Sequence, residues 1–270
     1  MTELLRTERL TCRFGGLVAV SEVDFSVQTG DVHGLIGPNG AGKTTFLNLI
    51  SGHIRKTGGR IIFCGEDLGT KPAELRAAAG IRRTFQNLRL FREMTALENV
   101  MVGMHADTKC DVFHSLVRSA VQRREEKEII DRAREALDFV GLLGAASTIA
   151  GSLPYGHQRL LEIARAFVVR PKILLADEPA AGLNAAEAGQ LVGLIRRIQK
   201  AGVTVMLVEH HMEVVMRACD RITVLNYGKK LADGSPADIR DHSGVIEAYL
   251  GTKPLYTRSR RNVEARHAAN

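Results

Sequence analysis

The segment Gly37 to Thr45, GPNGAGKTT, restricts the fold of this 270-residue chain more than any other stretch. It has the spacing G-x-x-x-x-G-K-[ST] of a phosphate-binding loop, and it lies between a strand-like run, VHGLI, and a helix-like run, TTFLNLIS. The glycines let the backbone bend so that its N–H groups converge on phosphate oxygens, and the helix adds its positive end. A glycine-rich turn that carries a lysine by chance is the alternative, which the flanking strand and helix disfavour.

The loop therefore predicts a site for a nucleoside triphosphate, with ATP and Mg²⁺ as the expected cofactors. Lys43 supplies a positive charge for the β- and γ-phosphates, and the hydroxyl of Thr44 can ligate Mg²⁺. The residues expected to contact the nucleotide here are Gly37, Pro38, Asn39, Gly40, Ala41, Gly42, Lys43, Thr44 and Thr45.

A pair of acidic residues follows a buried strand-like run further along the chain. The apolar residues 173–176 are followed directly by Asp177 and Glu178. Asp177 is predicted to hold Mg²⁺ through water, and Glu178 is the candidate general base facing the γ-phosphate. A surface turn is the alternative for this pair.

Strand-like and helix-like runs alternate over much of the chain, which predicts an α/β fold with a parallel sheet. We expect a P-loop NTPase core from residues 1–88 and 158–251, beginning with an N-terminal antiparallel β subdomain. Residues 89–157 are expected to form an inserted helical subdomain, in which the charge run RREEKE is a solvated helix face.

Composition points to a soluble protein of the cytoplasm. The longest apolar runs, such as VTVMLV, are far shorter than the ~20 residues that cross a bilayer, and the N-terminus shows no signal-peptide pattern. The four cysteines, at positions 12, 64, 110 and 219, form no Cys-x-x-Cys pair, so neither a zinc site nor a disulfide framework is expected.

The net charge of +7 raises the possibility of a nucleic-acid partner, but the distribution of charge argues against it. Residues 253–270 hold five basic residues and one acidic residue, a net of +4, which leaves +3 for residues 1–252. Residues 252–270 are expected to be a disordered basic tail, and no nucleic-acid partner is expected.

Motifs in a fixed order resemble those of the nucleotide-binding subunit of ABC transporters. After the phosphate loop come TFQNLRLF (84–91), LPYGHQ (153–158), ILLADEP (173–179) and VEHHM (208–212). The resemblance covers about residues 4–251, and it is far more specific than any single motif.

The resemblance implies further site residues. Gln86 would be the Q-loop glutamine that reaches Mg²⁺ and the attacking water, and His210 the switch histidine that contacts the γ-phosphate. Phe14 would stack on adenine, with Val20 nearby. The alternatives are a polar strand cap for His210 and an ordinary core position for Phe14.

The signature segment departs from the usual Leu-Ser-Gly-Gly-Gln of the family. Here Pro154 cannot donate a hydrogen bond, and Gly156 would allow close backbone approach. Tyr155, Gly156 and His157 are expected to contact ATP bound to an opposing subunit in a sandwich dimer. Asn184 stands where an aspartate is usual, and His211 where an acid is common.

The motifs are most similar to those of the importer ATPase for branched-chain amino acids. This branch implies transmembrane permease subunits, a second related ATPase as heterodimer partner or else a homodimer, and indirectly a periplasmic solute-binding protein. The chain would then lie in the cytoplasm, peripheral on the inner face of the membrane. The alternatives are uptake of urea or short amides, lipopolysaccharide export, and a soluble ABC ATPase without a transport role.

Overall fold

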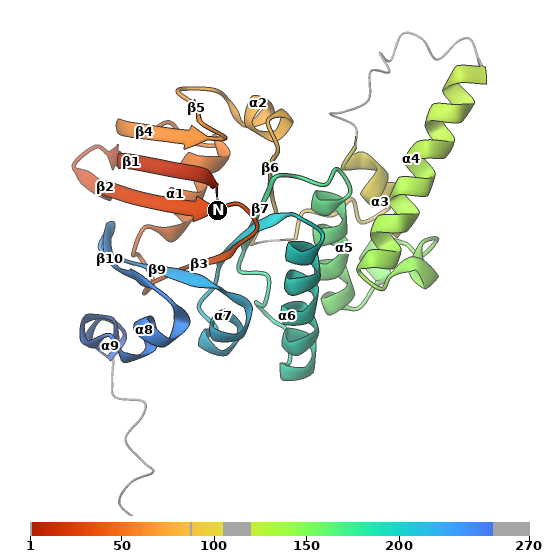
Figure 1. Cartoon of the computed structure of the whole chain (residues 1–270). Coiled ribbons are helices and arrows are strands. Elements are labelled where there is room, and N and C mark those ends of the chain that lie inside the picture. Colours follow the sequence, from red (N-terminus) through yellow and green to blue (C-terminus); the bar gives the residue numbers. More distant parts are fainter. Residues whose placement is uncertain (1, 87, 105–119, 251–270) are drawn as a thin grey trace, which may run out of the picture.

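The computed structural model describes residues 2–86, 88–104 and 120–250 and contains two sheets with helices around them (Figure 1). The predicted tail at 252–270 lies outside the described residues, as do Cys110 and the rest of residues 105–119 of the predicted helical subdomain. No described helix is long and apolar enough to span a membrane.

The first sheet is antiparallel and comes from the N-terminal part of the chain. Its strand order is β2-β1-β4-β5. The strands are β1 (Glu3–Phe14), β2 (Leu17–Gln28), β4 (Gly58–Phe63) and β5 (Glu66–Asp67).

The second sheet has the order β10-β9-β3-β8-β7-β6. Neighbouring strands run parallel from β9 to β6, and β10 is antiparallel to β9. The strands are β3 (Val32–Ile36), β6 (Ile81–Arg83), β7 (Ile173–Asp177), β8 (Thr204–Val208), β9 (Arg221–Asn226) and β10 (Lys229–Gly234). This sheet and the antiparallel sheet confirm the predicted fold class.

Helices surround the second sheet and extend to one side of it (Figure 1). They are α1 (Lys43–Ser51), α2 (Ala73–Ala78), α3 (Ala96–Val102), α4 (Ala120–Phe139), α5 (Tyr155–Phe167), α6 (Ala185–Lys200), α7 (Met212–Ala218), α8 (Pro236–Asp241) and α9 (Ser243–Leu250). Short 3₁₀ helices at Leu143–Ala145 and Ala150–Ser152 connect α4 to α5.

Two apolar clusters form the core, one on each face of the parallel sheet. The alternation of β7 divides its side chains between them: Leu175 packs with α1 and the antiparallel sheet, while Leu174 packs with the helices of the opposite face. Helix α1 buries Phe46 and Leu49 between the two sheets, so the helix that follows the phosphate loop is fixed from both sides.

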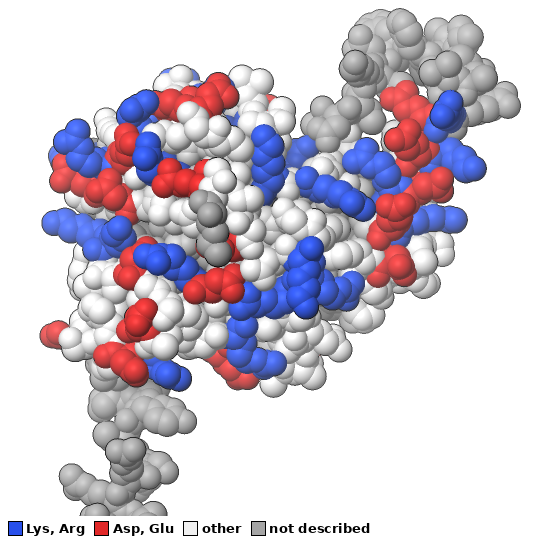
Figure 2. All heavy atoms as spheres, viewed as in Figure 1, with Lys and Arg blue, Asp and Glu red and all other residues white. Residues whose placement is uncertain are grey.

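Helix α4 carries the charge run and projects from the rest of the molecule. Figure 2 shows acidic and basic side chains interleaved along it. Its buried residues Ala133, Ala136 and Leu137 lie at helical spacing, and together with Val140, directly after its end, they pack in the same cluster as α3 and α5. The domain boundaries remain a prediction, and the continuous helix α5 runs across the predicted boundary between residues 157 and 158.

Candidate nucleotide-binding site

The phosphate loop connects the end of β3 to the start of α1. Its backbone is held by close neighbours: a Cβ atom on Gly37 would lie 2.1 Å from the carbonyl oxygen of Leu225, and one on Gly42 would lie 2.4 Å from that of Ala19. Both glycines have positive φ, 151° and 99°. The loop therefore requires glycine at these positions for space as well as for conformation.

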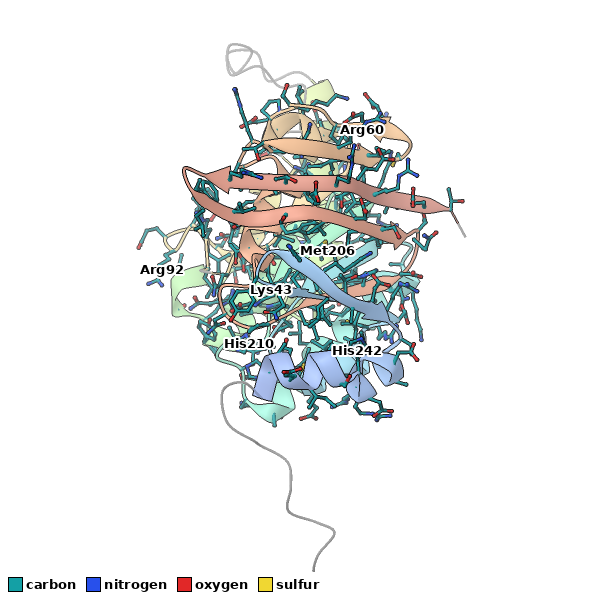
Figure 3. All side chains as sticks on the ribbon, turned by 90° about the vertical axis from the view of Figure 1, so that its left-hand side faces the viewer. Lys43, Arg60, Arg92, Met206, His210 and His242 are labelled. Carbon is teal, nitrogen blue, oxygen red and sulfur yellow. The ribbon has the colours of Figure 1, made fainter. Side chains whose placement is uncertain are left out.

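Lys43 is folded back over the loop that precedes it. Its Nζ donates to the carbonyl oxygen of Gly37 at 2.7 Å and to that of Pro38 at 3.1 Å. Burial lowers the pKa of the Lys43 ammonium, and the nearby carboxylates of Glu178 and Asp177 partly offset this effect. Figure 3 labels Lys43 and His210 below the antiparallel sheet.

The remaining residues of the predicted loop differ in solvent exposure. Asn39, Gly40 and Thr44 are exposed, while Pro38 and Thr45 are half-buried and Ala41 is buried. Thr44 lies in the first turn of α1, whose N-cap residue Gly42 offers no side-chain cap to the N–H groups of that turn.

Asp177 is buried and ion-paired at the end of β7. Its Oδ2 accepts from Nη2 of Arg83 at 2.7 Å, and both side chains are nearly inaccessible to solvent. Arg83 also donates to Oδ1 of Asn48 in α1 at 2.5 Å, so this one side chain joins β6, β7 and α1. Sequence reasoning did not identify Arg83, although an arginine in a short strand directly before TFQN is a usable signal.

Glu178 adopts a different geometry from its neighbour. It has φ of 47°, an uncommon conformation for a residue other than glycine, and its N–H donates to the carbonyl oxygen of Val208 at 2.8 Å. Nε2 of Gln86 donates to the Glu178 carboxylate at 2.9 Å, and Nδ1 of His210 lies 3.6 Å from it. The structure thus brings together the three residues that the sequence predicts to be catalytic.

Glu209 is a residue of this site that sequence reasoning missed. Its carboxylate is fully buried and accepts from the backbone N–H groups of Ala180 at 2.7 Å, His210 at 3.1 Å and His211 at 3.3 Å. It fixes the loop after Glu178 relative to the loop that carries His210. An acid between a buried strand and two histidines was the available signal. His211 is exposed and precedes α7.

The signature residues contact a different segment of their own chain. Pro154 is the N-cap residue of α5 and makes no side-chain cap. A Cβ atom on Gly156 would lie 2.7 Å from Oε1 of Glu187, so close approach at Gly156 already occurs within the chain. Glu187 and Asn184 form a capping box at the start of α6, and His157 is exposed.

The two residues predicted near adenine differ in their exposure to solvent. Phe14 is 51% exposed at the turn between β1 and β2, so the alternative interpretation as a core residue is wrong. Val20 has no exposed surface and packs among the antiparallel sheet and α1. Base stacking by Phe14 stays a prediction, and Val20 offers no surface to a base in this structure.

The predicted Mg²⁺ ligands supply oxygen atoms only. They are the hydroxyl of Thr44, the carboxylate of Asp177 and the amide of Gln86, a donor set that suits Mg²⁺ when phosphate oxygens complete it. Within residues 2–86, 88–104 and 120–250, no group of three or more His, Cys, Asp or Glu side chains could hold a metal.

Comparison with known proteins gives consistent matches. A family model described as ABC transporter matches residues 20–181, and a model described as branched-chain amino acid ATP-binding cassette transporter matches residues 229–253. The high-affinity branched-chain amino acid transport ATP-binding protein BraF of Pseudomonas aeruginosa is 47% identical over 92% of this chain and 98% of its own length. LivG of Escherichia coli K12, of the same description, is 45% identical with the same coverage.

A solved structure supports the same assignment. The ADP conformation of an ATP-binding cassette of an ABC transporter superposes with a TM-score of 0.82 and 31% identity, covering 93% of this chain and all of that one. With a phosphate loop, an acidic strand end and a matching family model over most of its length, the chain belongs to the ABC transporter family, among ATP-binding proteins similar to BraF and LivG.

Proposed function

We propose that this chain is the ATP-hydrolysing subunit of an importer for branched-chain amino acids. The solute is supported by the descriptions of the relatives at 45–47% identity and of the family model at residues 229–253. The observation that carries the hydrolytic role is the convergence of Gln86 and His210 on Glu178, close to the phosphate loop and Lys43.

Binding of the triphosphate would use groups that the loop already orients. The N–H groups of the loop and of the first turn of α1 receive the phosphates, and Lys43 exchanges its carbonyl acceptors for phosphate oxygens. Thr44, Asp177 and Gln86 would hold Mg²⁺, which neutralises phosphate charge when bound. Asp177 would remain ion-paired with the buried guanidinium of Arg83, whose positive charge would then lie close to the site.

Glu178 would act as the general base in hydrolysis. Its carboxylate takes the proton of the attacking water, while the hydrogen bond from Gln86 keeps that carboxylate in place. His210 approaches the same carboxylate oxygen, Oε2, and its side chain is half exposed, so its ring would be able to turn and donate to the γ-phosphate. The carboxylate of Glu209 fixes the backbone of His210 by accepting a hydrogen bond from the His210 N–H group.

A second subunit would complete the site. Tyr155, Gly156 and His157 at the start of α5 would meet the γ-phosphate of ATP held by an opposing ATPase chain, where the helix dipole favours negative charge. The opposing chain would be a related subunit or a second copy. Closure of this sandwich on ATP, and its release on hydrolysis, would move transmembrane permease subunits between two states.

The location follows from this assembly. Contact with the permeases would run through residues 82–102, and a periplasmic binding protein would deliver the solute to them. The chain would then be peripheral on the cytoplasmic face of the inner membrane. Uptake of labelled leucine in a deletion strain tests the solute; a defect confined to urea or amide uptake would overturn it.

Glu178→Gln tests the hydrolytic assignment. Because the amide cannot accept the proton of water, ATP turnover should fall by at least about 100-fold while ATP-bound dimer accumulates. Turnover is measured as phosphate release and dimer formation by size-exclusion chromatography with ATP. Glu213→Gln is the matched control, since this exposed glutamate in α7 pairs only with Arg217 among the ion pairs described for it. Normal hydrolysis by Glu178→Gln would refute the general base.

A further inference from the structure

Tyr155 lies against the loop that follows Glu178. A Cβ atom on Gly182 would lie 2.9 Å from Cε1 of the Tyr155 ring, so the ring sits directly over this glycine. Gly182 has φ of 78° and belongs to the loop whose Ala180 N–H is held by Glu209. The start of α5 therefore contacts a segment that is itself tied to the catalytic loops.

The hydroxyl of Tyr155 is bonded to a buried arginine on the same helix. Nη2 of Arg159 donates to Oη of Tyr155 at 2.8 Å, and the same nitrogen donates to the carbonyl oxygen of Gln86 at 2.6 Å. The Arg159 guanidinium also lies over the Tyr155 ring, with Cζ 5.4 Å from its centroid. One nitrogen thus joins Tyr155 to the residue that orients Glu178.

Arg159 is fixed in turn by the backbone of the Q-loop and by a buried acid. Its Nη1 donates to the carbonyl oxygen of Phe85 at 3.0 Å and lies 3.4 Å from Oε2 of Glu162. Oε1 of Glu162 accepts from the N–H of Phe85 at 3.2 Å. Arg159 and Glu162 are only 4% and 2% exposed, so these bonds lie largely out of contact with water.

We propose that Tyr155 is a positioning residue that couples the start of α5 to the Q-loop and to the loop at 180–184 of its own chain. We call the set Phe85, Gln86, Tyr155, Arg159, Glu162 and Gly182 the signature junction. A displacement of α5 by an opposing subunit is then transmitted to Gln86, and through Gln86 to Glu178. This role rests on the proposed ATPase function and lies within the chain, in addition to the contact expected across the dimer.

The charged hydrogen bond determines how strongly Tyr155 acts. Without the hydroxyl, Nη2 of Arg159, whose side chain is only 4% exposed, keeps the carbonyl of Gln86 but loses its second acceptor. The ring contact with Gly182 would persist in phenylalanine. Tyr155→Phe therefore removes the hydrogen bond by which Tyr155 reaches the Q-loop through Arg159, while leaving the contact with the loop at 180–184.

The test uses nucleotide-free full-length chain and the amide proton of Phe85. Because Phe85 N–H donates to Glu162, its hydrogen exchange by NMR reports the junction directly. Tyr155→Phe should speed this exchange on the order of tenfold, the effect of losing a charged hydrogen bond. Tyr227→Phe is the control, because it removes a hydroxyl from a side chain that is 86% exposed.

Kinetics separate positioning from a merely structural role. In Tyr155→Phe, kcat for ATP hydrolysis should fall on the order of tenfold while ATP affinity of the isolated chain is unchanged. Unaltered exchange at Phe85 in Tyr155→Phe would overturn the proposal, whether or not turnover changes. Absence of ATPase activity in the unaltered protein would instead overturn the proposed function, and the exchange measurement would still decide on the junction.

Discussion

The phosphate loop and the signature junction are built in opposite ways. The side-chain bonds of the loop close over short distances in sequence, as when Lys43 reaches the carbonyl of Gly37 six residues earlier. The bonds of the junction join Arg159 to Phe85 and Gln86, 74 and 73 residues apart. The side-chain bonds of the loop need only β3 and α1 beside one another, whereas the junction forms only when α5 has docked beside β6.

Arg83 connects these two regions, and its removal should have the largest effect on stability. It bonds to Asn48 in the helix after the loop and to Asp177, and its strand leads into the Q-loop. Arg83→Met leaves the carboxylate of Asp177 buried without its ion-pair partner, which should lower the free energy of unfolding by about 3–5 kcal/mol. Urea denaturation followed by circular dichroism measures this.

Arg60→Met is the matched control for Arg83→Met. Arg60 makes an ion pair of similar length with Asp67, at 3.0 Å, but its side chain is 57% exposed. Screening by water makes such a pair a weak contributor, so no resolvable change is expected. Equal losses in the two variants would show that burial does not govern the strength of the Arg83 contact.

His33 lies in β3, the strand that leads into the phosphate loop, and a change of pH can show whether this strand depends on tertiary contacts as the junction does. The ring is fully buried, with Nε2 2.9 Å from Oγ1 of Thr223, which bonds to Asp233. Burial lowers the pKa of His33 to about 4. Folding therefore favours the neutral ring, and its contribution is present above the unfolded pKa of about 6.5 and lost as pH falls towards 4.

Between about pH 7 and about pH 5, protonation of His33 in the unfolded chain should remove about 2 kcal/mol of the free energy of unfolding. His33→Gln has no such group, so its unfolding free energy should fall less over the same interval. Urea midpoints at the two pH values in both proteins measure the difference. Identical pH slopes would show that His33 is not the titrating group, and that β3 does not share the dependence of the junction on tertiary contacts.

Pro154→Ser, at the start of the helix that carries the signature junction, should have the smallest effect of these changes. Serine can cap the start of α5, which proline does not, but it loses the restriction that proline places on the unfolded chain. The two effects oppose one another, so stability should change by less than about 1 kcal/mol, and turnover by less than about twofold. A large loss of turnover would mean that Pro154 itself helps to place α5.

The residues of the site could be predicted from the sequence better than the surroundings of those residues in the fold. It predicted that Gln86, Glu178 and His210 act together, and the structure brings them together. It could not predict the left-handed backbone of Glu178 or the ion pair of Asp177, since both depend on strands distant in sequence. Glu209 could be singled out by its place between a buried strand and two histidines, but not its partners, because these are backbone N–H groups that leave no residue pattern.

By itself, the sequence determined the α/β fold class, the phosphate loop and the acidic strand end. These depend on local spacing: glycine conformations, alternation along strands and apolar periodicity along helices act over a few residues. Only the tertiary structure decided that Asp177 is neutralised by Arg83 and that Tyr155 faces its own Q-loop and Gly182. The reason is that buried charges and hydroxyls take their partners from whatever side chains the packed strands and helices bring within reach.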